Sequence, residues 1–195
     1  MNSLLAAGTS PEFALPSIEY RLISPILLVL GMAVISVLVE AFVPRAHRRV
    51  VQLVLTFSTL IVALILVVML AGQRAVTAAG SLAVDGPALF MQGTLLVLAL
   101  MAALLVAERG VDPAGDAFAA RANALPGSID EREFTKRGWL TTEVWCLFLF
   151  SVGGMMLFVT GTDLLILFVA LEIMSLPLYL LAGIARRRRL LSQEA

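Results

Sequence analysis

The sequence predicts an all-α, polytopic membrane protein with five transmembrane helices, and two features of the whole chain support this. Of its 195 residues, 60% are hydrophobic and only 14% are charged, and the mean hydropathy is +0.97. A soluble domain is about 45–50% apolar and about 25% charged, and a disordered chain is poor in apolar residues. The hydrophobic residues also form continuous runs, without the alternation of an outer-membrane barrel strand. The composition therefore excludes a soluble domain and a disordered chain.

Five apolar segments are long enough, or nearly long enough, to cross the bilayer as helices. Roughly 20 residues of helix span about 30 Å of hydrocarbon. The segments cover residues 22–43, 50–71, 88–107, 144–160 and 164–185. More than half of the chain is therefore expected to be solvated by lipid or by other helices.

The first residues are expected to form an uncleaved external tail at 1–21. A signal peptide begins with basic residues before a short apolar core. The first 20 residues contain no Lys or Arg, and they carry Pro11, Glu12, Pro16 and Glu19 before the first long apolar run. This segment is therefore read as a polar tail.

Residues that start or stop helices lie at the ends of the apolar segments. Pro44 ends the first helix, because proline cannot continue the backbone ladder, and Pro87 opens the third. Residues 160–163 leave almost no loop between the fourth and fifth segments, so these two form a tight antiparallel hairpin. Thr162 or Asp163 can accept hydrogen bonds from the free amides at the start of the fifth helix.

The basic residues predict the orientation of the chain. Lys and Arg concentrate in the cytoplasmic connections of membrane proteins. Only Arg21 and Arg74 fall on one side of the predicted membrane, and the other 12 of the 14 fall on the opposite side. These are Arg45, Arg48, Arg49, Arg109, Arg121, Arg132, Lys136, Arg137, Arg186, Arg187, Arg188 and Arg189. The N-terminus is therefore expected outside and the C-terminus in the cytoplasm.

The sequence thus divides into an external tail (1–21), three transmembrane helices (22–108), a cytoplasmic loop (109–141), a helical hairpin (142–185) and a basic cytoplasmic C-terminus (186–195). The loop is expected to be irregular, and it contains no phosphate-binding or redox motif. One cysteine, Cys146, and one histidine, His47, are too few for a zinc or haem site built by this chain. Equal numbers of acidic and basic residues give no indication of a nucleic-acid partner.

Glu172 is the one charged residue that lies well inside an apolar segment. It follows Leu164 by eight residues, which places it roughly 12 Å below the membrane surface at about 1.5 Å per residue. An ionised carboxylate near mid-membrane costs about 2.5–3.5 kcal/mol on insertion scales. Glu172 suits a proton relay, and it equally suits a neutral acid that hydrogen-bonds a neighbouring helix. The residues alone leave both interpretations open.

Three smaller features accompany this carboxyl group. Pro177 frees the backbone carbonyl of Ile173, beside Glu172, and either a polar pocket or a kink that serves only packing follows from this. The glycine pair 153–154 in the fourth segment is expected to permit close helix contact. Glu40, at the inner end of the first segment, can be neutralised by Arg45 and Arg48, while Glu143 is expected to act at a helix start.

Residues 147–189 resemble a known family. The sequence LFLFSVGGMMLFVTGTDLLILFVALEIMSLPLYLLAGIARRRR is similar to helices four and five of the antiporter-like subunits of proton-pumping NADH-quinone oxidoreductase (respiratory complex I). The LE..SLPLY core most resembles the subunit N family of actinobacterial type. VLGMAVISVLVEAFVP and VDGPALFMQG, earlier in the chain, also fit this family, so the resemblance spans the whole sequence.

The resemblance implies a role for Glu172. It matches the glutamate of the family's fifth helix, which transfers protons and pairs with a lysine on helix seven. The family fold has about fourteen helices, and this sequence covers its N-terminal part. Its only lysine, Lys136, lies in the predicted loop, and the sequence stops where helix six would begin. The chain is therefore expected to be a fragment, a truncated product or one of two complementary pieces, and not to pump by itself.

The resemblance also implies the cofactors, partners and location. The chain binds no cofactor and no metal, and NADH, FMN, iron–sulfur clusters and the quinone, expected to be menaquinone, are handled by partner subunits. The expected partners are the other membrane-arm subunits, the missing C-terminal helices and the lipid bilayer of the cell membrane, with no nucleic acid. Two other functions remain open: part of a cation/proton antiporter subunit, and a structural membrane protein that transports nothing.

Overall fold

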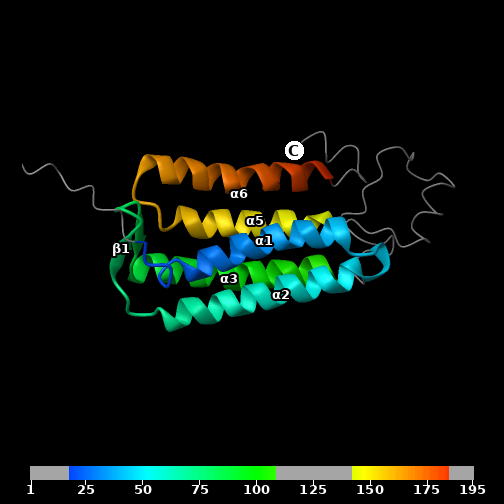
Figure 1. The fold of residues 1–195 in the computed structure, drawn as a ribbon, viewed down its shortest axis with the longest axis horizontal. Helices are drawn as coiled ribbons and strands as arrows, with labels where there is room; N and C mark the ends of the chain where they lie inside the picture. Colours follow the sequence, from blue (N-terminus) through cyan, green and yellow to red (C-terminus); the bar gives the residue numbers. More distant parts are fainter. Residues whose placement is uncertain (1–17, 109–141, 185–195) are drawn as a thin grey trace, which may run out of the picture.

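The computed structural model describes residues 18–108 and 142–184, and its five helices lie side by side along the long axis (Figure 1). A short hairpin of two strands connects the second and third helices. The elements are α1 (Ser24–Phe42), α2 (Arg45–Met69), β1 (Ala75–Thr77), β2 (Leu82–Val84), α3 (Gly86–Ala107), α5 (Glu143–Phe158) and α6 (Leu164–Ile184). The expectation of an all-α membrane protein with a helix for each apolar segment is confirmed.

Four of the helices are long and apolar enough to cross a membrane: α1, α2, α3 and α6. α5, which the sequence predicts as a fifth span, is also apolar but has only 16 residues. Such a helix is about 24 Å long, shorter than the hydrocarbon layer. The central position of α5 explains how a short helix is accommodated, since protein surrounds it where the other helices face outward.

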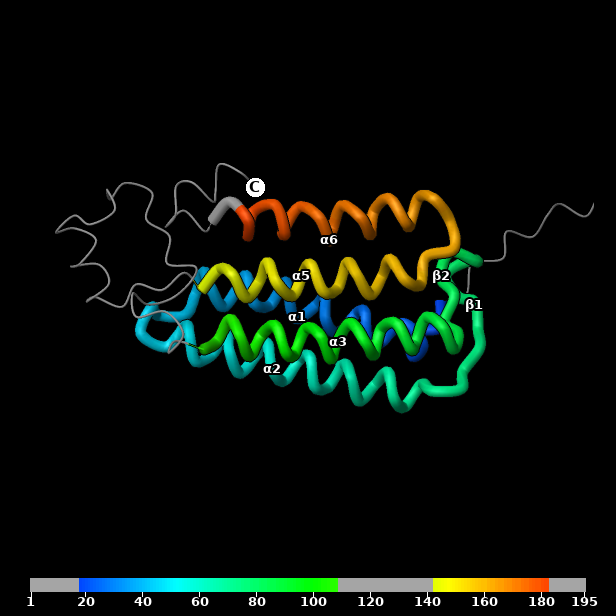
Figure 2. Tube along the Cα trace, turned by 180° about the vertical axis from the view of Figure 1, so that it is seen from behind, coloured from blue at the N-terminus to red at the C-terminus, as the bar shows by residue number. Residues whose placement is uncertain are grey.

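The apolar core is formed by α1, α2, α3 and α5. Its members come from these four helices, the residues that flank them and Val84 of β2, and α6 contributes no residue to the cluster in the described part of the chain. α6 packs chiefly on α5, which separates it from the rest of the bundle (Figure 2). In α6 only 11% of the apolar window is buried, against 28% or 33% in the other three membrane-length helices. α6 is therefore the edge of the described bundle.

The helix ends follow the expected chemistry with one difference. Asp85 precedes α3 and its side chain accepts from the amide of Ala88 at 2.9 Å. Pro44 separates α1 from α2 as predicted, but α2 begins at Arg45, five residues before the apolar segment. Arginine is a good helix former, so α2 extends beyond the lipid-facing sequence. The arginines expected in a connection therefore lie on the first turns of a helix.

The hairpin β1–β2 is a feature that the sequence analysis missed. Its strands are antiparallel and pair Ala75 with Val84 and Thr77 with Leu82. Strands of three residues are too short to give a recognisable alternation. The hairpin contacts the connection between α5 and α6: the Ala83 amide donates to the Thr160 carbonyl at 2.8 Å. We call this side of the bundle the hairpin end.

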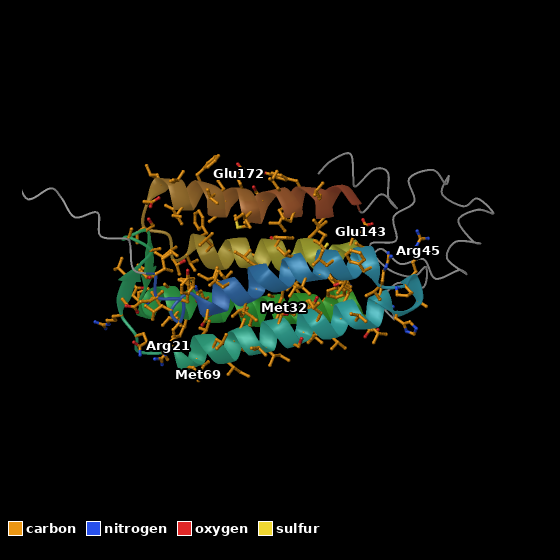
Figure 3. All side chains as sticks on the ribbon, in the orientation of Figure 1. Arg21, Met32, Arg45, Met69, Glu143 and Glu172 are labelled. Carbon is orange, nitrogen blue, oxygen red and sulfur yellow. The ribbon has the colours of Figure 1, made fainter. Side chains whose placement is uncertain are left out.

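The opposite side of the bundle, which carries Arg45, Arg48 and Arg49, is called the arginine end. Figure 3 shows Arg45 at this end and Arg21 near the other. The helices thus alternate in direction as predicted, although the side that faces the cytoplasm remains a prediction. The loop at 109–141, the C-terminus at 186–195 and nearly all of the tail at 1–21 lie outside the described residues.

Asp163 joins α6 to the hairpin end. Its carboxylate accepts from the Ile166 amide at 2.8 Å, which confirms the expected cap. This bond, followed by one from the Ser81 side chain, holds the pKa of Asp163 below its ordinary value. A lowered pKa in the folded state stabilises the fold above the unfolded-state pKa, and this contribution is lost as the pH falls through the folded-state pKa.

Asp163→Ala is therefore expected to lower the melting temperature of the protein in detergent at neutral pH, and the difference from wild type should shrink as the pH falls below the ordinary range of aspartic acid. Circular dichroism at several pH values measures both. Asp163→Asn, which keeps a cap acceptor, should be the milder variant at neutral pH. A difference between wild type and Asp163→Ala that is the same at all pH values would contradict the role given to the ionised carboxylate.

Candidate functional site

Glu172 lies midway along α6 (Figure 3), on the face that points away from α5. The buried residues of α6, Ala170 and Pro177, are seven positions apart and face α5. At 100° per residue, Glu172 is on the opposite side of the helix. It is itself half-buried. The carboxyl group thus lies on the outer face of α6, at the edge of the described bundle.

The neighbours of Glu172 on this face are large, apolar and exposed. They lie four or seven positions away on either side, and each has more than half of its surface exposed; they are Leu165, Phe168, Leu176 and Tyr179. Such a face is typical of a helix that contacts lipid or another helix. A carboxyl group at its centre distinguishes it from a simple lipid-facing surface, since ionisable residues within membranes face protein or water.

No side chain in the described residues hydrogen-bonds or ion-pairs with Glu172. The prediction that the Pro177 break creates a polar pocket around Glu172 is not decided by these contacts. The sequence interpretation of a neutral acid that bonds a neighbouring helix finds no partner within residues 18–108 and 142–184. A partner for this group therefore has to come from outside the described residues.

The other side of α6 is held against α5 by two small residues. The Ser151 hydroxyl donates to the Met174 carbonyl at 3.2 Å. A Cβ added to Gly154 would lie 2.5 Å from the Met174 amide nitrogen and 2.9 Å from the carbonyl carbon of Ile173. α5 therefore touches the α6 backbone at the two residues that directly follow Glu172. The predicted close contact at Gly154 is confirmed, and Ser151 is a residue that the sequence analysis missed.

Gly153 makes the corresponding approach to α1. A Cβ there would overlap Cδ2 of the Leu30 side chain. Unlike the obstacle beside Gly154, this one is the far end of a flexible side chain and can move. The two neighbouring glycines thus let α5 fit between α1 and α6, but only Gly154 meets rigid backbone.

A second polar group lies at the arginine end, centred on Glu40 of α1. Its carboxylate pairs with Arg48 of α2 at 3.1 Å and accepts from the Thr142 hydroxyl at 2.7 Å and from the Gln52 amide at 3.3 Å. Gln52 in turn accepts from the Ser36 hydroxyl at 2.6 Å. The predicted neutralisation by Arg48 is confirmed. We call Glu40, Arg48, Gln52, Ser36 and Thr142 the Glu40 cluster.

The Glu40 cluster joins three helices and is accompanied by a contact to a fourth. Thr142 immediately precedes α5, and its hydroxyl bonds Glu40 and not an amide of its own helix. Arg49, next to Arg48, donates to the Ala107 carbonyl at the end of α3 at 3.0 Å. The first turns of α2 therefore tie α1, α3 and α5 together. Buried Gln52 and Ser36 are single polar residues in apolar runs, which is a signal that the sequence analysis did not use.

The two carboxyl groups consequently suit different chemistry. Glu40 is surrounded by donors, as expected of a group that holds helices together in a medium without water. Glu172 accepts no hydrogen bond and forms no ion pair within the described residues, so it does not tie helices together there. Within the described residues no group of three or more His, Cys, Asp or Glu side chains could hold a metal ion.

Comparison with known proteins finds relatives in the family that the sequence motifs resemble. The chain is 51% identical over 193 residues to NADH-quinone oxidoreductase subunit N of Parafrankia sp. (strain EAN1pec), a match that covers 99% of the chain. It is 53% identical over 194 residues to subunit N of Acidothermus cellulolyticus, also over 99% of the chain. The resemblance to subunit N is confirmed.

The match to subunit N also has a limit. Subunit N of Nocardioides sp. (strain ATCC BAA-499 / JS614) is 52% identical over 94% of the chain, but only 36% of that relative is covered. The chain spans about 37% of the length of the other two relatives. No family model matches the chain. The match thus concerns one part of subunit N, and this part includes the helix that carries Glu172.

Gly154→Ala is expected to lower the free energy of unfolding by about 1–3 kcal/mol, because its methyl group meets the α6 backbone and the helices must separate. The effect of Gly153→Ala should be smaller. Unfolding of the two variants in mixed detergent micelles measures the difference. Gly153→Ala is the matched control, since Leu30 can move aside. Equal stability of the two variants would contradict the close α5–α6 contact.

Glu40→Leu is expected to lower the free energy of unfolding by about 1–3 kcal/mol, because Arg48, Gln52 and Thr142 each lose an acceptor. Thr142→Val should cost less, and the double variant should cost less than the sum of the two, because both changes remove the same bond. The same unfolding measurement tests this. Strictly additive effects would show that Glu40 and Thr142 do not interact.

Proposed function

We propose that the chain is the part of a complex I subunit N that carries one proton-transferring carboxyl group, Glu172. The activity of such a complex is proton translocation driven by electron transfer from NADH to a quinone, with menaquinone as the expected acceptor. The observation that carries the proposal is Glu172 itself: a carboxyl at the centre of a membrane-length helix, on a face without partners in the described structure. The similarity to proteins named subunit N supports it.

The role of this chain within the complex is that of a translocase component without a redox centre of its own. Oxidation of NADH and reduction of the quinone are assigned to partner subunits that hold FMN and iron–sulfur clusters. Within this chain, Glu172 gains a proton from one aqueous side and releases it toward the other. The complex lies in the cell membrane, and within it this chain is expected to lie beside other membrane-arm subunits.

Further helices of the same subunit would cover the exposed face of α6. The relatives are more than twice as long as the matched part. A cationic residue or ordered water from those helices would supply the partner that Glu172 lacks here. The resemblance assigns this partner to a lysine on helix seven. A change in its distance from Glu172 would alternately stabilise the charged and the neutral carboxyl group.

Glu172→Gln in the full-length subunit is expected to lower NADH-driven proton translocation in inverted membrane vesicles at least about tenfold, while the amount of assembled complex stays normal. The amide has nearly the same size but cannot exchange a proton. Acidification measured with a pH-sensitive dye, together with NADH oxidation, tests this.

The matched control is Glu143→Gln, the same chemical change in the first turn of α5 at the arginine end. It should leave translocation unchanged. Normal pumping in Glu172→Gln would remove the role proposed for this residue. Loss of sodium/proton exchange without any dependence on NADH would instead favour the cation/proton antiporter alternative.

A further inference from the structure

We propose that Ser151 is a positioning residue for Glu172. Its hydroxyl bonds the Met174 carbonyl across the α5–α6 interface and so fixes the rotation of α6 at the turn that carries the carboxyl group. This inference rests on the proposed function, since it concerns how the same proton-transferring group is aimed. Four structural features support it.

The first feature is the direction of the Ser151 hydrogen bond. Hydroxyl groups in apolar helices commonly donate to a carbonyl of their own helix, as Ser58 and Thr59 do toward Leu55. Ser151 donates to a different helix, although it is 1% exposed and lies in the middle of α5. Its hydroxyl therefore links α5 to α6 and adds nothing to the backbone ladder of α5.

The second feature is the break in the α6 ladder at the same level. Pro177 has no amide hydrogen, so the Ile173 carbonyl loses its usual partner four residues later. The internal hydrogen bonds of α6 are thus weakest just after Glu172. Ser151 and Gly154 contact the backbone at Ile173 and Met174. The Ser151 bond goes to the carbonyl next to the freed one, so α5 holds α6 at the turn where its ladder is interrupted.

The third feature is the lack of other support for α6. It packs chiefly on α5, and its remaining surface is apolar and exposed. The direction of Glu172 about the axis of α6 is therefore set by contacts on the opposite side of the helix. Ser151 supplies a directional contact there, in addition to the close approach of the backbones at Gly154.

The fourth feature is the position of Ser151 relative to Gly154. The two residues are three apart, so they share one face of α5. The absence of a side chain at Gly154 brings the backbones close enough for the short side chain of Ser151 to reach across. Gly154 thus fixes the separation of the helices and Ser151 fixes their rotation. A misplacement of about 1 Å at a reacting group costs up to about 100-fold in rate.

The test is Ser151→Ala in the full-length subunit within the assembled complex. The change deletes one oxygen atom, and the quantity measured is the number of protons translocated per NADH oxidised. We expect this ratio to fall by about threefold, the factor that corresponds to one interhelical hydrogen bond in a membrane protein. The amount of assembled complex should stay normal. Ser58→Ala, which deletes a hydroxyl bonded only within its own helix, is the matched control and should leave both quantities unchanged.

The outcomes separate this inference from the proposed function. If Glu172→Gln lowers the ratio and Ser151→Ala does not, the positioning role is wrong and the proposed function stands. If Glu172→Gln itself has no effect, the proposed function fails. A loss of assembled complex with a normal ratio per complex would assign Ser151 a purely structural role. Ser151→Cys, a weaker donor of similar size, should give a ratio between those of wild type and Ser151→Ala, and a ratio below that of Ser151→Ala would overturn the proposal.

Discussion

A carboxyl group in hydrocarbon must be either neutral or surrounded by hydrogen-bond donors, because no bulk water is present to solvate its charge. This constraint separates Glu40 from Glu172. Glu40 of α1 has an ion pair with Arg48 and accepts from Gln52, both on α2, and from Thr142 at the start of α5. Glu172 has none of these partners in the described structure. The first group holds the bundle together, and the second is the group for which we propose proton transfer.

α5 connects these two groups. Its start is tied to Glu40 through Thr142, and its middle presents Ser151 and Gly154 to the backbone of α6. α5 is shorter than the other helices, but it lies at the centre of the bundle and touches α1, α3 and α6. One helix therefore contacts both the residues around Glu40 and the turn of α6 that carries Glu172.

The sequence predicted the helices well because the signal for each is long. Twenty or so apolar residues leave little alternative to a helix in lipid, and Pro44, Pro87 and Asp163 mark boundaries by local chemistry. The start of α2 was missed since arginines at a membrane surface give no apolar signal, although they continue the helix. The hairpin β1–β2 was missed because three-residue strands have no detectable period.

The depth of Glu172 followed from counting residues, but the face on which it lies depended on knowing which side of α6 meets α5. Ser151 and Gln52 could not be assigned partners, because those partners are distant in sequence. We propose proton exchange at membrane depth for Glu172 and not for Glu40.

Labelling by a hydrophobic carbodiimide tests whether Glu172 carries a proton within the membrane. Such a reagent partitions into lipid and forms a stable adduct with carboxyl groups that carry a proton there. In membranes that contain the assembled complex, peptide mass spectrometry should find the adduct on Glu172 and not on Glu40, whose oxygens are occupied by Arg48, Gln52 and Thr142. An adduct on Glu40 with none on Glu172, or equal labelling of the two, would contradict the different roles given to these two carboxyl groups.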